Sequence, residues 1–452
     1  MTDEFDLIVL GTGAGGSTPA TTCRKAGWRV AIVDDLPFGG TCGNRGCDPK
    51  KVLVGGAEIV SWQRHMQGHG ISGDASIDWP ALMEFKRTFT DPVPSTREST
   101  FRNAGIEMLH GEARFVADDR IVVSGRELAA KHFVIATGAS PRPLGIPGEM
   151  HVRTSTDFME LDELPRRIVF VGAGYISLEF AHLARRAGAE VVVLGRGTPL
   201  PSFDEVLVNR LLEYSREIGI DVRLDHSVSE VMHDPGSGVF RVCVGHGTSM
   251  HEIETDLVVH GAGRVPNTQK LHPEVGRIEL ERHGFVRVNE FLQSVSNPRV
   301  YAAGDVVGLP GSLALTPVAG HEGSVVSTNL LDGNSVRPDF RGVASAVFTI
   351  PTLSGVGLTE KAARASGADV RVATGDTTQW FTNRRVREPV GMFKTIIDKG
   401  TDRILGAHIL GGHGEEVINL FAMAIRFDLA AAEVKKMLFS YPTGGSNMQY
   451  ML

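Results

Sequence analysis

The feature that most constrains the fold of this sequence is a strand–glycine–helix–strand unit that occurs twice, over residues 7–34 and 168–195. Each copy has an apolar run, a glycine-rich turn (GTGAGG, then GAGYIS), a helical stretch and a second apolar run. Continuous β-branched runs bounded by glycine are typical of buried parallel strands. Two such units predict an α/β chain with two Rossmann-like dinucleotide-binding domains.

The first copy has the full pattern of a dinucleotide site. Its glycines follow a predicted strand and open a predicted helix, and Asp34 lies 18 residues after Gly16. Glycines allow the backbone to approach a pyrophosphate at the helix N-terminus, and Asp34 can accept hydrogen bonds from ribose hydroxyls. A tight strand–helix turn without a ligand is the alternative, which the strand, the helix and the acid together disfavour.

The second copy differs at the positions that select the nucleotide. Ser177 stands for the third small residue, and the position of the ribose-binding acid holds Gly195, followed by Arg196. Without a carboxylate a 2′-phosphate is not repelled, and Arg196 can pair with it. This copy therefore favours NADPH over NADH. In the alternative interpretation Arg196 is a solvated surface charge.

Two of the four cysteines lie in a glycine-rich segment, GGTCGNRGCDPKK, over residues 39–51. Cys42 and Cys47 would not point together on a regular helix, so the glycines must allow a bend. A thiolate near Lys50 and close to a helix start has a lowered pKa. Two ordinary buried cysteines are the alternative. Four cysteines are too few for a disulfide-stapled secreted fold, and the chain offers no clustered zinc ligands, so no metal site is expected.

Length and composition exclude several classes of protein. The 452 residues correspond to about three domain lengths, and a net charge of −7 argues against nucleic acid as a partner. No apolar run reaches the length of a membrane-spanning helix, so no membrane partner is expected. The acidic opening lacks the basic and apolar pattern of a secretory signal, so the cytoplasm is the expected location.

Further motifs occur between and after the two glycine turns: ATG at 136–138, GRVPN at 263–267, YAAGD at 301–305 and LTP at 315–317. With the cysteine segment, they make the whole sequence resemble the class I pyridine nucleotide–disulfide oxidoreductases, the family of glutathione reductase, dihydrolipoamide dehydrogenase and mercuric reductase. The resemblance implies an FAD-binding domain in two parts (1–150 and 266–336), an NAD(P)H-binding domain (151–265) and a C-terminal α+β dimerisation domain (337–452).

The resemblance also implies roles for individual residues. Cys47 would be the charge-transfer thiolate beside the flavin and Cys42 the thiol that attacks the substrate. Lys50 and Glu179 would form a buried ion pair near flavin N5, Tyr175 would gate the nicotinamide pocket, and Asp305 would hold the ribityl chain. The expected FAD-binding residues are Gly11, Gly13, Ala14, Gly16, Asp34, Thr41, Cys42, Lys50, Ala113, Thr137, Gly138, Asp305 and Thr316. Those for NADPH are Gly172, Gly174, Tyr175, Ile176, Glu179, Arg196 and Gly263.

The sequence departs from the family where disulfide-reducing members have an acid–base pair. Tyr441 stands in the histidine position and Ser446 in the glutamate position. A tyrosine, with a pKa of about 10, is mainly a proton donor at neutral pH. Tyr441 is therefore a candidate catalytic donor, or else a packing residue at the dimer interface. Mercuric reductases also use a tyrosine, but they carry a C-terminal cysteine pair that this sequence does not show. Ser324 replaces a glutathione-binding arginine.

The leading hypothesis is an enzyme that passes electrons from NADPH through FAD and a Cys42–Cys47 disulfide to a small disulfide-type oxidant. An oxidant with an activated leaving thiol needs little help from a general acid. The alternatives are a reductase of metal ions, metalloids or quinones, and a redox- or NADPH-sensing flavoprotein. A homodimer is expected, with Val417, Leu420, Phe421 and Ile425 of a predicted helix over 415–427 as an interface stripe, or else as part of an internal core.

Overall fold

The computed structural model describes residues 3–452, and it divides them into two compact units that are each built from three stretches of chain. The first unit comprises the described residues up to Lys50 together with Phe85–Arg142 and Arg264–Phe340. The second comprises Lys51–Glu84, Pro143–Gly263 and Arg341–Leu452. Two helices, α3 (Cys47–Met66) and α4 (Trp79–Thr90), contribute residues to both units.

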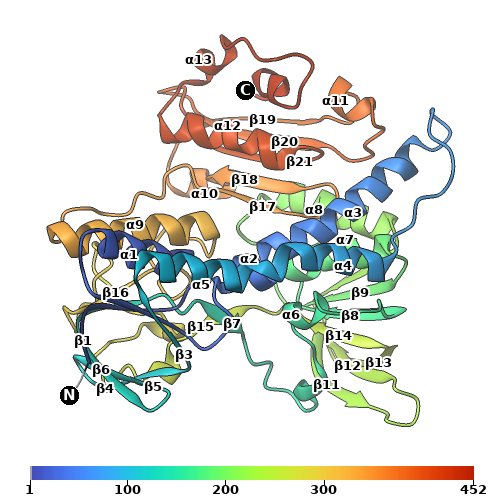
Figure 1. Ribbon diagram of the computed structural model, residues 1–452. Coiled ribbons are helices and arrows are strands. Elements are labelled where there is room, and N and C mark those ends of the chain that lie inside the picture. The colour runs from blue at the N-terminus through green and yellow to red at the C-terminus, as the bar shows by residue number, and fades with distance from the viewer. Residues whose placement is uncertain (1–2) are drawn as a thin grey trace. The chain divides into compact units, whose positions relative to one another are not determined.

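The first unit is built on a mixed sheet with the strand order β3-β2-β1-β6-β5-β4, in which β16 also pairs with β6 (Figure 1). The apolar runs predicted as strands form its centre, and Leu7, Ile8 and Val9 are fully buried because both faces are covered. Parallel pairing joins β1 (Asp3–Leu10), β2 (Val30–Asp34), β3 (Glu107–His110), β6 (Arg126–Ile135) and β16 (Val300–Ala302). An antiparallel arm adds β4 (Ala113–Ala117) and β5 (Arg120–Val123).

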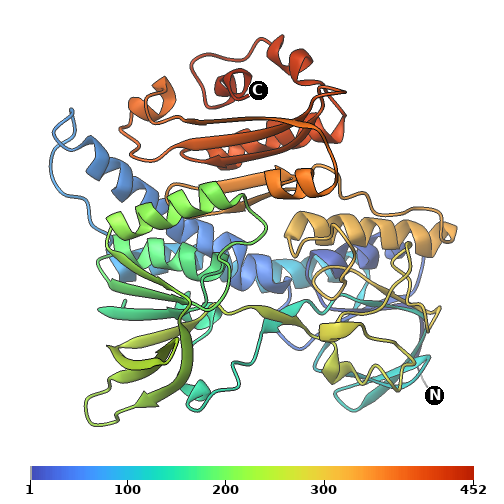
Figure 2. The ribbon, with the colours of Figure 1, turned by 180° about the vertical axis from the view of Figure 1, so that it is seen from behind.

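Helices α1 (Ala14–Lys25) and α9 (Thr316–Asp332) lie side by side on this sheet, as both ribbon views show (Figures 1 and 2). Gly323 permits this close packing, because a Cβ there would lie 2.8 Å from the carbonyl oxygen of Gly15. The other elements of the unit are α2 (Gly40–Arg45), α5 (Pro92–Ala104), the ribbon β7 (Ala139–Pro141) with β15 (Arg264–Pro266), η2 (Gln269–Leu271) and η3 (Arg282–Gly284).

The second glycine unit forms a parallel sheet with the order β10-β9-β8-β14, beside a three-stranded antiparallel sheet β11-β12-β13. The parallel strands are β8 (Arg167–Val171), β9 (Glu190–Gly195), β10 (Ile220–Leu224) and β14 (Leu257–His260). The antiparallel ones are β11 (Ser227–His233), β12 (Phe240–His246) and β13 (Ser249–Thr255). The helices here are η1 (Glu149–His151), α6 (Ser155–Phe158), α7 (Tyr175–Arg186) and α8 (Glu205–Glu217).

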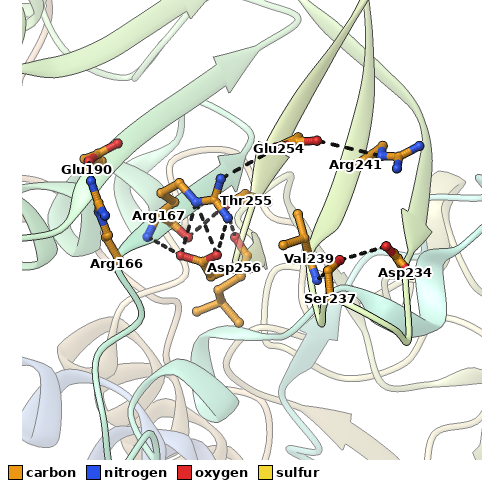
Figure 3. A network of polar contacts seen from close by, with 11 residues as sticks. Arg166, Arg167, Glu190, Asp234, Ser237, Val239, Arg241, Glu254, Thr255 and Asp256 are labelled. Carbon is orange, nitrogen blue, oxygen red and sulfur yellow. Dashed lines mark hydrogen bonds and ion pairs between the residues drawn. The ribbon is translucent and has the colours of Figure 1, made fainter.

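A polar network joins these two sheets where β13 ends and β14 begins (Figure 3). Arg167 donates from its guanidinium to Asp256 Oδ1 at 2.5 Å and from its backbone to Oδ2 at 2.9 Å. The Thr255 hydroxyl donates to the carbonyl of Arg167 at 2.8 Å. The hydrogen bond from Arg167 lowers the pKa of Asp256. The network fixes the start of β8, the strand that leads into the second glycine turn.

The C-terminal part of the second unit is an antiparallel sheet with the order β17-β18-β21-β20-β19, covered on one face by helix α12 (Gly414–Arg426) (Figure 2). The strands are β17 (Ala344–Val347), β18 (Leu353–Gly357), β19 (Val370–Asp376), β20 (Met392–Asp398) and β21 (Ile404–Leu410). The short helices are α10 (Glu360–Ala365), α11 (Phe381–Arg384), α13 (Ala431–Lys435) and η4 (Gly445–Tyr450).

The α12 stripe predicted as a dimer interface packs instead largely into the core of its own unit. Val417 is 5 % exposed and Phe421 is fully buried, while Leu420 and Ile425 are half-buried against the same cluster. Helical spacing shows that a face is covered but does not show by what. The prediction of an interface stripe is thus wrong for Val417 and Phe421.

The mixed α/β fold predicted from the two glycine units is confirmed. Across residues 3–452, the structure contains no helix that is both long enough and apolar enough to cross a membrane.

Candidate active site

The first glycine turn connects β1 to α1 in the way a bound pyrophosphate requires. Gly11 has a φ of +107°, and a Cβ there would lie 2.2 Å from the Ala136 carbonyl oxygen. Gly16 is equally constrained, since its Cβ would lie 2.1 Å from the oxygen of Gly11. Gly13 precedes the first helical residue, Ala14, and no side chain caps the helix, so its N-terminal amides face a potential anion.

Asp34 is held at the end of β2 beside this turn. Its Oδ2 accepts hydrogen bonds from the backbone and hydroxyl of Thr12, at 2.8 and 2.5 Å, and its Oδ1 accepts from the Leu36 amide at 3.1 Å. Ala113, at the start of β4, follows Gly111, whose amide donates to the Asp34 carbonyl at 2.9 Å. The turn, the helix end and the fixed carboxylate therefore fit one dinucleotide.

Two further expected flavin residues lie in a turn that follows β6. The Thr137 hydroxyl donates to the Asn267 carbonyl at 2.6 Å, and the amide of Asn267 donates to Gly138, which has a φ of +70°. These bonds tie the ATG turn to the GRVPN segment.

Asp305 follows β16, and burial raises the pKa of its carboxyl group. Sequence reasoning missed its neighbour Glu322 on α9, which is fully buried and accepts from the Gly304 amide at 2.6 Å. Burial raises the pKa of Glu322 to about 7. The sequence signal that could have identified Glu322 is that it is the one glutamate in the largely apolar helix α9.

The redox segment is bent, as its glycines predicted. Helix α2 ends at Arg45, Gly46 adopts a non-helical conformation, and α3 starts at Cys47. A Cβ on Gly46 would lie 2.8 Å from the carbonyl oxygen of Thr41, so only glycine fits this bend. Cys42 is half-buried, Cys47 is exposed, and both are free thiols in this structure.

The two thiols have opposite pKa shifts. The pKa of Cys47 is lowered to about 6, chiefly by a hydrogen bond with Cys42 and also by Thr316 and Lys50, while partial desolvation and Asp48 act in the opposite direction. The same hydrogen bond, together with burial, raises the pKa of Cys42. These shifts favour Cys47, rather than Cys42, as the thiolate of the pair.

Each of the two sulfur atoms has a polar neighbour that supports its protonation state. Cys47 is the first residue of α3, and its Sγ lies 3.7 Å from the hydroxyl oxygen of Thr316, the first residue of α9. A thiolate at helix N-termini is stabilised by the backbone dipoles. On the other sulfur, the Cys42 thiol donates to Asp48 Oδ1 at 3.7 Å. Sequence reasoning did not assign Asp48 a role.

The second glycine turn repeats the first at β8 and α7. Gly172 has a φ of +104°, and its Cβ would lie 2.5 Å from the Gly261 carbonyl oxygen. Gly174 precedes the helix without a side-chain cap. Ser177 packs so closely that a Cβ on Gly261 would lie 2.0 Å from its hydroxyl. Tyr175 is 45 % exposed and Ile176 half-buried at this helix start, and Gly263 follows β14 with a φ of +104°.

The end of β9 carries Gly195 and Arg196, the two residues on which the prediction of NADPH rests. A Cβ on Gly195 would lie 2.7 Å from that of Ala173, so no acidic side chain fits there without a shift, and Arg196 is exposed. The His226 amide donates to the Gly195 carbonyl at 3.0 Å, and the His226 ring stacks on that of His246 at 4.4 Å. These histidines beside the turn were missed because they lie far from it in sequence.

Glu179 and Lys50 belong to different units, so their ion pair stays a prediction. Glu179 is 1 % exposed, and its Oε1 accepts from the Phe348 amide at 2.7 Å. Lys51, the neighbour of Lys50, lies over the Phe348 ring at 4.6 Å and pairs with Glu58 at 3.0 Å.

The C-terminal loop places Tyr441 and Ser446 differently. Tyr441 is 73 % exposed, whereas Ser446 is 2 % exposed. The Ser446 hydroxyl accepts from the Thr443 amide at 3.2 Å and donates to the Thr443 carbonyl at 2.7 Å. Ser446 therefore closes its own loop, and it cannot supply the carboxylate that orients a catalytic histidine in an acid–base pair.

Fold and site together define a protein with two dinucleotide sites and a polarised pair of cysteines. The pyridine nucleotide-disulphide oxidoreductase family matches residues 5–323, and the dimerisation domain of that family matches residues 343–452. The chain therefore belongs to the pyridine nucleotide-disulphide oxidoreductases, and the predicted family is confirmed. It is an NAD(P)H-dependent flavoprotein oxidoreductase that uses FAD and a nicotinamide nucleotide, and its C-terminal domain supports a homodimer.

Similar proteins reduce different acceptors. A glutathione reductase of Burkholderia cepacia is 32 % identical over 97 % of this chain and 96 % of its own length. A mercuric reductase of Lysinibacillus sphaericus is 30 % identical over 98 % of this chain and 81 % of its own. The solved Cu(II) complex of the HOCl-induced flavoprotein disulfide reductase RclA from Escherichia coli has a TM-score of 0.88 at 28 % identity, covering 100 % of this chain and 99 % of that one.

Proposed function

We propose that this chain passes electrons from NADPH, by way of FAD and a redox-active Cys42–Cys47 pair, to a small thiol-reactive oxidant that needs no dedicated acid–base pair. The observation that carries the proposal is the placement of the two sulfurs. Cys47 begins helix α3 with its Sγ 3.7 Å from the Thr316 hydroxyl, and the Cys42 thiol donates to Asp48 Oδ1 at 3.7 Å. Gly11, Gly13 and Asp34 would hold FAD, which would supply the two-electron chemistry between the nicotinamide and the cysteine pair.

The reduced cysteines then act in a fixed order. Cys42 Sγ attacks one sulfur of a disulfide oxidant, forms a mixed disulfide and expels the first thiolate. The Cys47 thiolate attacks Cys42 Sγ, which re-forms the Cys42–Cys47 disulfide and releases the second thiolate. Two electrons thus pass to the oxidant, and the thiolates take up protons from water.

Activation of Cys42 falls to a residue of its own segment. The Asp48 carboxylate accepts the hydrogen bond of the Cys42 thiol, so it is placed to receive the proton as the sulfur attacks. With tyrosine and serine in place of the histidine and the glutamate, no comparable base comes from the C-terminal loop. Activated disulfides, whose low-pKa thiolates leave without protonation, are the acceptors that suit this arrangement.

Copper(II) is the second candidate acceptor, favoured by the likeness to the RclA copper complex. Two Cu(II) ions would take two electrons from the Cys47 thiolate and the Cys42 thiol, which would re-form the disulfide, yield two Cu(I) ions and release the one proton of Cys42. No leaving group then requires an acid, which agrees with the absence of the family histidine at position 441. Thiolates are ligands that Cu(I) prefers.

A panel of oxidants tests the proposal and separates the two candidates. The FAD-loaded protein would be given NADPH with dithiobis-nitrobenzoate, oxidised glutathione, lipoamide or Cu(II), and NADPH consumption followed. The disulfide candidate predicts that kcat/KM is highest for the aromatic disulfide, and the copper candidate predicts the highest value for Cu(II). Cys42→Ser should abolish both reactions. Rapid turnover of oxidised glutathione would contradict the proposal, as would full activity in Cys42→Ser.

A further inference from the structure

A pocket of about 580 Å³ lies in the second unit. One wall is formed by Met66 and His69, at and beyond the end of α3, and the other by the segment that joins β19 to β20. That segment contributes Arg384, Arg385 and Arg387. The volume suits a small molecule.

The segment that joins β19 to β20, residues 377–391, carries the three arginines and is held by internal hydrogen bonds. The Asn383 side chain is buried and donates to the carbonyl and the hydroxyl of Thr377, at 3.0 and 2.9 Å. The Glu388 amide donates to the Asn383 carbonyl at 3.0 Å. Arg387 adopts a φ of +53°, a conformation that costs free energy in a non-glycine residue and often occurs at ligand-binding positions. The segment thus presents its guanidinium groups from a fixed turn.

Three arginines and one glutamate give this pocket an excess of positive charge. In the part of the chain that the structure describes, no carboxylate forms an ion pair with Arg384, Arg385 or Arg387. The guanidinium fork matches phosphate and carboxylate groups and forms two parallel hydrogen bonds with them. Three such groups around one hollow favour an anion with more than one charge.

Glu388 gives a second reason, separate from the arginines, to expect a ligand in this pocket. It lines the same pocket, it is only 4 % exposed, and its Oε1 has no hydrogen-bond partner among residues 3–452. Burial raises its pKa to about 7, an effect that nearby Arg186 partly offsets. A buried polar atom without a partner is costly, and a hydroxyl or N–H group of a ligand could satisfy it.

We propose that this pocket binds a small multivalent anion that also carries a hydroxyl group. Arg384, Arg385 and Arg387 would hold the anionic groups, and Glu388 would accept from the hydroxyl. A phosphorylated sugar and a hydroxylated polycarboxylate share this chemistry. The proposal does not depend on the electron acceptor, so the two can fail separately.

Calorimetric titration of the FAD-loaded dimer tests the site with three probes: fructose 1,6-bisphosphate, citrate, and tricarballylate, which is citrate without its hydroxyl. Saturable binding of the bisphosphate alone supports a sugar phosphate, and binding of citrate in preference to tricarballylate supports a hydroxycarboxylate. Failure of all three to bind would overturn the proposal. Equal binding of citrate and tricarballylate would refute the role of Glu388.

A double variant and a matched control distinguish a specific binding site from a general effect of surface charge. The double variant R384Q/R387Q should weaken binding at least about tenfold, because two guanidinium groups that would bind the anion are lost. The control R282Q/K361Q removes the same charge at exposed positions outside the pocket lining and should leave binding unchanged. Equal weakening in both double variants would overturn the proposal. Flavin absorbance and thermal unfolding check that each variant is folded.

Discussion

Replacing Thr316 by valine is expected to raise the pKa of the Cys47 thiol. The Thr316 hydroxyl lies 3.7 Å from Cys47 Sγ and is one of the groups that lower this pKa to about 6. Valine keeps the shape of threonine but removes the hydroxyl. The thiolate is then less stable relative to the thiol, so a more alkaline pH is needed to form it.

The size of the shift follows from the contact. A hydrogen bond to a charged group contributes about 1.5–3 kcal/mol, and a long bond to an exposed sulfur belongs at the lower end of that range. Since about 1.4 kcal/mol corresponds to one pKa unit, the midpoint should move up by about one unit. The midpoint for thiolate formation should therefore lie about one pH unit higher in the variant than in the same protein with Thr316.

The assay uses a Cys42→Ser background, in which Cys47 cannot form the disulfide. The long-wavelength absorbance of the thiolate against oxidised flavin is titrated with pH, and the alkylation rate of Cys47 gives a second readout. Thr316→Ser, which keeps the hydroxyl, is the control and should leave the midpoint unchanged. An unchanged midpoint in Thr316→Val, or equal shifts in both variants, would show that the Thr316 hydroxyl does not stabilise the Cys47 thiolate.

Four further outcomes are expected. Asp48→Asn should lower the midpoint of the Cys47 titration, because it removes a nearby negative charge, yet should slow disulfide reduction; an upward shift would contradict this. Arg196→Ala should reduce kcat/KM for NADPH roughly tenfold and spare NADH, and equal loss with both would make Arg196 structural. Gly261→Ala should destabilise the fold by about 1–3 kcal/mol in thermal or urea unfolding, with rescue by Ser177→Gly, since the new Cβ meets the Ser177 hydroxyl. Tyr441→Phe should slow the reduction of alkyl disulfides more than that of aromatic ones; uniform loss would indicate a packing role.

The sequence was enough to predict those features that depend only on local backbone geometry. The glycine turns, the bend at Gly46 and the carboxylate of Asp34 each follow from what the backbone can adopt within a few residues. The same holds for the contrast between Asp34 and Gly195, which separates the two nucleotide sites.

Residues that meet only in the folded chain could not be predicted. Glu322 reaches Gly304 from another element, and Arg387 shares its pocket with Met66 from a distant part of the sequence. The prediction of a dimer interface on α12 was wrong for a different reason. Helical periodicity shows that one face of a helix is buried, but it does not show whether the same chain or a partner buries it. Phe421 accordingly belongs to the core of its own unit.

The most direct test of the central claim is to count the cysteine thiols before and after reduction by NADPH. The air-oxidised, FAD-loaded protein is alkylated under denaturing conditions, with and without prior anaerobic NADPH, and the modified residues are located by mass spectrometry. Reduction by NADPH should expose two new thiols, Cys42 and Cys47, while Cys23 and Cys243 are alkylated in both samples. Alkylation of Cys42 and Cys47 to the same extent without NADPH would contradict a redox-active pair.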